Sequence, residues 1–76
     1  MKGGIVMKGN EFVGLVRDNN KCDRIARGTE FRVYDKDNIY VCTVGVIRTS
    51  VAFLDVVNDL PVDLYTENYT FVEQKD

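Results

Sequence analysis

Few side chains in this 76-residue chain could carry out chemistry, and the residue types that are missing exclude several kinds of site. The sequence has no histidine and a single serine, Ser50, which excludes a Ser-His-Asp triad and a His-ligated metal site. Its two cysteines, Cys22 and Cys42, form no CxxC motif. We expect Cys22 to be an ordinary thiol beside basic residues and Cys42 to belong to the core.

The acidic residues suggest two metal sites, and neither pattern is complete. Asp35-Lys36-Asp37-Asn38 opens like a calcium loop, but the next residue is Ile39, where a ligand is needed. We therefore expect a hairpin turn there. Asp55, Asp59 and Asp63 repeat every four residues, but a proline interrupts any helix that would align them. We predict no metal, no cofactor and no enzymatic activity.

The strongest candidate site is a basic stretch that continues into aromatic residues. Residues 1–32 carry seven basic and four acidic side chains, whereas residues 33–76 carry three basic and eight acidic ones. Arginine and tyrosine are enriched in protein interfaces, and the same pair can hold phosphates and stack bases. The plainer interpretation is a solvated charged surface. The residues that we predict to contact a partner are Arg24, Arg27, Arg32, Tyr34 and Tyr40.

The composition favours strands, because the chain has twelve valines and two alanines. We predict strands at residues 4–7, 12–17, 29–34, 39–48, 51–57 and 69–73. A polar loop at 18–24 and turns at 35–38 and 49–50 separate them. Residues 62–68 are expected to include at most one short helical turn before the last strand.

Short strands at this spacing predict one all-β domain over residues 1–76, a five- to six-stranded antiparallel barrel or roll. The segment 66–73, Thr-Glu-Asn-Tyr-Thr-Phe-Val-Glu, resembles the end of an SH3-like barrel, where a short helical turn precedes the final strand. The paired tryptophans of peptide-binding SH3 domains are absent, so no proline-peptide groove is expected. An OB-like roll is the alternative.

The predicted strand at 39–48 is unusual because both of its faces are apolar. Tyr40 and the even-numbered positions up to Val46 are apolar, and so are most odd-numbered positions from Ile39 to Ile47. A strand that is half exposed to water normally alternates. Either the strand bends at Gly45 and serves two packed layers, or one face stays open for another molecule. The residues that we predict for self-association are Val41, Ile47 and Phe53.

These observations favour a protein that acts by its surface. No apolar run is long enough for a membrane span or a signal peptide, and we expect a cytoplasmic protein with reduced thiols. We predict a small interaction module that binds and modulates a larger partner protein and also forms a homodimer, like accessory proteins of bacteriophages and mobile elements. The alternatives are a small-barrel nucleic-acid-binding protein and a binder of a small anionic ligand.

Overall fold

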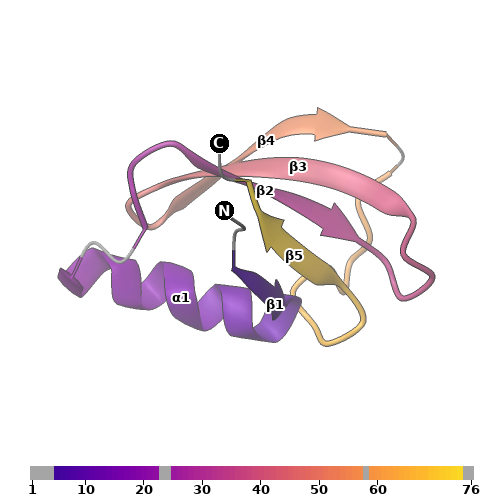
Figure 1. Ribbon diagram of the computed structural model, residues 1–76, viewed down its shortest axis with the longest axis horizontal. Helices are drawn as coiled ribbons and strands as arrows, with labels where there is room; N and C mark the ends of the chain where they lie inside the picture. Colours follow the sequence, from indigo (N-terminus) through magenta and orange to yellow (C-terminus); the bar gives the residue numbers. More distant parts are fainter. Residues whose placement is uncertain (1–4, 23–24, 58, 75–76) are drawn as a thin grey trace.

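Five antiparallel strands and one helix make up the fold in the computed structural model, which describes residues 5–22, 25–57 and 59–74 (Figure 1). The strands pair in the order β1-β5-β2-β3-β4. The expected all-β antiparallel architecture is confirmed, but the sheet does not close into a barrel, because β1 and β4 are its two edges. The elements are β1 (Val6–Lys8), α1 (Gly9–Cys22), β2 (Thr29–Tyr34), β3 (Tyr40–Ile47), β4 (Ser50–Val56) and β5 (Thr70–Glu73).

The helix α1 corrects the predicted strand at 12–17 and the predicted polar loop at 18–24. Phe12, Val16 and Asn19 are buried at intervals of four and three residues, which is the spacing of one helix face. At the start of the helix, the backbone N–H of Lys8 donates to the Glu11 carboxylate at 2.9 Å, which fixes the first turn. Helical spacing and this N-terminal contact outweigh the strand preference of the valines.

The core lies between the sheet and a second layer formed by α1 and residues 59–69, which we call the crossing segment. This segment leads from the edge strand β4 back to β5 in the interior of the sheet (Figure 1). The ring of Phe12 stacks on Phe71 with centroids 4.3 Å apart, meets Phe31 edge-on at 5.0 Å, and stacks on Tyr65 at 6.3 Å. We call the covered side the inner face and the opposite side the outer face. The buried apolar residues are Phe12, Val16, Ile25, Phe31, Val33, Cys42, Val44, Val46, Leu64 and Phe71.

Two small irregularities decide which side chains reach the outer face. The pairing of β2 with β3 shifts after Val33, so that Tyr40 lies opposite Tyr34 and not on the face of Cys42 and Val44, as the sequence predicted. The pairing of β3 with β4 shifts after Thr43, which leaves Leu54 as the extra residue. The second hairpin turn is at residues 48–49, one position earlier than expected.

Gly45 has a different role from the predicted corner. It is buried in β3, and a Cβ built on it would lie 3.2 Å from Cδ1 of Leu54. The missing side chain therefore leaves room for Leu54 to fold over the outer face. Because Leu54 covers part of the outer face of β3, that face can be apolar as well as the inner one.

The start of α1 requires a glycine because two backbone segments approach closely there. The N–H of Gly9 lies 3.0 Å from the carbonyl oxygen of Thr66 and 2.9 Å from that of Tyr69. A Cβ at Gly9 would lie 2.4 Å from the carbonyl oxygen of Leu64 and 2.7 Å from that of Thr66. Glycine therefore lets the crossing segment lie against the helix.

We predict that Gly9→Ala lowers the free energy of unfolding by about 1–3 kcal/mol, because the new methyl group forces rigid backbone apart. Gly14→Ala is the matched control, since nothing lies within 4 Å of a Cβ at that position of the same helix. It should raise the free energy of unfolding by up to about 1 kcal/mol through helix propensity. Urea unfolding followed by circular dichroism measures both. A Gly9→Ala protein as stable as wild type would contradict the close approach.

Asn19 connects the last part of α1 to two distant segments. Its side chain is 1% exposed, and both ends of the amide are satisfied. Nδ2 donates to the carbonyl oxygen of Arg48 at 2.8 Å, and Oδ1 accepts from the N–H of Ile25 at 2.8 Å. The amide thus holds the β3–β4 turn and the segment before β2 against the helix.

We predict that Asn19→Ala lowers the free energy of unfolding by about 2–4 kcal/mol, because it leaves a backbone donor and a backbone acceptor without their partner. Asn10→Ala, at an exposed position of the same helix, should change it by less than about 0.5 kcal/mol. Chemical unfolding of the two variants side by side tests this. Equal effects would show that the amide does not tie the segments together.

Candidate functional site

The outer face carries a cluster of aromatic, basic and acidic side chains from three neighbouring strands. Arg32 and Tyr34 come from β2, Tyr40 and Thr43 from β3, and Asp55 from β4, and together they line an open hollow of about 370 Å³. The rings of Tyr34 and Tyr40 meet edge-on with centroids 5.9 Å apart. We call these five residues the outer patch.

Hydrogen bonds orient the tyrosine at the centre of the outer patch. The hydroxyl of Tyr40 donates to Oδ2 of Asp55 at 3.0 Å and is in short contact with the hydroxyl of Thr43. A phenol has one proton, so the Thr43 hydroxyl must donate to the Tyr40 oxygen. The bond from Thr43 lowers the pKa of Tyr40, but desolvation, the hydrogen bond to Asp55 and the charge of Asp55 together raise it above 10.0.

The structure brings together three of the five residues predicted to contact a partner. Arg32, Tyr34 and Tyr40 share the outer patch, whereas Arg27 lines a separate hollow with Asn19 and Arg48. Arg24 lies outside the described residues.

Sequence reasoning missed Thr43 and Asp55 as members of the outer patch. They are direct cross-strand partners, and Thr43 also pairs with Arg32. The signal that could have found them is the strand register. That register depends on the two shifts in pairing, which the local sequence pattern does not reveal.

The residues predicted for self-association lie at different depths. Val41 is partly buried against the core, whereas Ile47 and Phe53 are each 43% exposed. Leu54 is 54% exposed and Val56 is 42% exposed, so β4 presents apolar side chains on both faces of an open edge.

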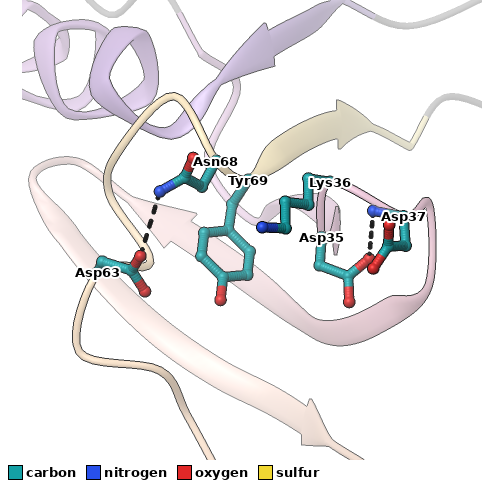
Figure 2. A pocket seen from close by; sticks show the side chains of 6 residues that line it. All are labelled: Asp35, Lys36, Asp37, Asp63, Asn68 and Tyr69. Atoms are coloured by element: carbon teal, nitrogen blue, oxygen red, sulfur yellow. Dashed lines mark hydrogen bonds between the residues drawn. The ribbon is translucent and has the colours of Figure 1, made fainter.

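A third hollow, of about 160 Å³, lies between the β2–β3 turn and the crossing segment (Figure 2). Oδ1 of Asp35 accepts from the N–H groups of Asp37 and Ile39 at 2.9 and 3.0 Å, which confirms the predicted hairpin turn. Asn68 donates to Asp63 at 3.3 Å, beside the Tyr69 ring in this view. The carboxylates of Asp35 and Asp63 therefore each accept a hydrogen bond within the fold.

Metal binding finds no support in this hollow or elsewhere in the part of the chain that the structure describes. No group of three or more Cys, Asp or Glu side chains there could hold an ion. Asp55 and Asp63 line different hollows.

At Tyr69, desolvation and the charges of Asp63 and Asp35 raise the pKa of the phenol.

The thiol of Cys42 belongs to the core, as predicted. Its side chain is fully buried and free of any disulfide. Burial raises the pKa of this thiol, and the charge of Asp55 raises it further. A buried, protonated thiol is a poor nucleophile. The side chain of Cys22 is not among those described.

Comparison with family models, with curated proteins and with solved structures finds no match for this chain. Among its described residues, no helix has the length and apolar character that a membrane span requires. The function is therefore inferred from the chemistry of the residues themselves.

We predict that Asp55→Asn lowers the pKa of Tyr40, because the amide removes a negative charge that disfavours the phenolate. Asp59→Asn, a charge change outside the outer patch, should leave that pKa unchanged. Titration followed by NMR of the tyrosine Cζ carbons measures both variants. The folded-state pKa of Tyr40 lies above its unfolded value of 10.0, so its contribution to stability is intact below pH 10 and is lost as the pH rises through the folded pKa. Identical Tyr40 titrations in wild type and Asp55→Asn would rule out the coupling.

Proposed function

We propose that this chain is a non-catalytic interaction module that docks on a larger protein through the outer patch and modulates it. The observation that carries this proposal is the gathering of Arg32, Tyr34 and Tyr40 on the uncovered face of the sheet. Within this proposal, the chain is a small accessory protein of a phage or mobile element and acts in the cytoplasm.

The geometry of the outer patch suits a binding surface. Tyrosine and arginine supply large amphipathic contact areas and are enriched among residues that dominate binding energy. The Tyr34 ring rests against Tyr40, and the Tyr40 hydroxyl is held by Thr43 and Asp55. A side chain that is already held in place loses less conformational entropy when a partner binds.

The charges around the outer patch favour a protein over a nucleic acid. Asp55 lies within the patch, and Glu30 is exposed on the same strand as Arg32. The whole chain carries a net charge of −2. Nucleic-acid affinity depends on basic groups that release counterions from phosphates, and nearby carboxylates oppose it.

The nucleic-acid alternative keeps one specific observation in its favour, the pair of tyrosines beside Arg32 on an open sheet. Bases stack on such rings while an arginine contacts the backbone. The alternative of a small anionic ligand has its best support at Arg27 and Arg48, which line one hollow of about 310 Å³.

We predict that affinity capture with the tagged full chain retains a specific protein after nuclease treatment, and that Arg32→Glu or Tyr34→Ala lowers its recovery at least tenfold. Lys36→Glu is the matched control, since it also reverses an exposed charge but lies in the hairpin turn. Mass spectrometry of the captured proteins gives the readout.

Fluorescence anisotropy with single-stranded DNA and RNA at low salt tests the alternative. If the chain binds a protein partner, we expect no oligonucleotide binding that falls steeply with salt. Capture that disappears with nuclease, together with tight and salt-sensitive oligonucleotide binding, would replace it with the nucleic-acid function.

A further inference from the structure

The edge strand β4 has features that natural proteins usually avoid on an open edge. Edges are commonly blunted by shortness, lysine, proline, inward-pointing charge or a β-bulge, and of these devices β4 has only the bulge at Leu54. β4 is seven residues long and carries a single ionisable side chain, Asp55, which points to the outer face and pairs with Tyr40. The other edge, β1, is three residues long and ends in Lys8.

Apolar side chains flank this edge on both faces. Phe53 and Val56 belong to the inner face, because they pair with the buried residues Val44 and Cys42. Leu54 lies on the outer face over Gly45. On the inner side, Val51 also lines an apolar groove of about 270 Å³ with Phe12, Val13, Val16, Arg17 and Tyr65.

We propose that β4 pairs antiparallel with β4 of a second copy of this chain, about a two-fold axis near Phe53. This inference goes beyond the outer patch and does not depend on it. The edge offers little that would recognise a highly charged peptide, whereas a mostly apolar strand complements it, and β4, with Asp55 as its single ionisable residue, is itself such a strand. Because a two-fold axis joins identical surfaces, the pairing closes as a dimer.

The charges beside β4 are complementary in this arrangement. Antiparallel pairing places the turn before β4 of one copy beside the segment after β4 of the other. Arg48, exposed in that turn, then approaches Asp59, exposed beyond the strand end, and the axis repeats the contact. With the axis at Phe53, Asp55 lies opposite the Val51 end of the second strand, so the two Asp55 carboxylates are not directly opposed.

The pairing also joins the two inner faces. An axis perpendicular to the sheet keeps both α1 helices on the same side. The two Phe53 side chains meet at the axis, and the apolar grooves beside Val51 lie on the same side of the joined sheet. The result is a ten-stranded sheet, and because the contact is one strand wide we expect a Kd on the order of micromolar.

Sedimentation equilibrium on the full chain tests the proposal, at roughly 1–500 μM to bracket the expected Kd. The mass should rise from that of the 8.7 kDa monomer toward twice that value. Phe53→Lys should weaken association at least tenfold. Val62→Lys is the control, because it also introduces a lysine in place of an apolar side chain, but at a fully exposed residue away from the edge, and it should associate like wild type. If Phe53→Lys fails to fold by circular dichroism, Val56→Lys takes its place.

The charge contact gives a second readout. Arg48→Glu should weaken association, and adding Asp59→Arg to it should restore part of the loss. A wild-type chain that stays monomeric throughout, an assembly larger than a dimer, or a dimer unaffected by both β4 lysine variants would each overturn the proposal.

Discussion

The stacking of Phe12 on Phe71 is the contact on which the rest of this structure depends. The Phe12 ring also meets Phe31 and Tyr65, so one side chain joins α1, β2, β5 and the crossing segment. A chain of this length buries only about 60% of its unfolded surface, which leaves a thin core with few substitute contacts. Gly9 makes the arrangement feasible, because it lets the crossing segment lie against the start of the helix that carries Phe12.

The part of the fold that could be predicted from the sequence is the part built from local alternation. β2 was predicted with its observed boundaries, because Phe31 and Val33 alternate cleanly with polar neighbours and an Asp- and Asn-rich turn follows. The helix was missed because valine biases a short apolar segment toward strand. The contacts that favour a helix over a strand at α1 are those that Phe12 and Asn19 make with distant segments.

The outer patch shows a different limit of sequence reasoning. Arg32 and Tyr34 could be placed on one face from their spacing along β2. Tyr40 could not, because an extra residue in the pairing moves it to the opposite face from the one that simple alternation gives. Thr43 and Asp55 then become its hydrogen-bond partners through the register of β3 and β4. Local sequence determined the residue types at this surface, and strand register determined which of them meet.

The pairing of β1 with β5 affects when the fold can be completed. Ile5 and Glu73 lie 68 positions apart and are joined by hydrogen bonds in both directions. The meander β2–β3–β4 consists of neighbouring hairpins and can form while its own residues are being translated. The β1–β5 ladder has to wait until β5 has left the ribosome. Until then, β2 is itself an open edge. A nascent chain therefore exposes β2 and β4 as strand edges, whereas the finished protein exposes β1 and β4.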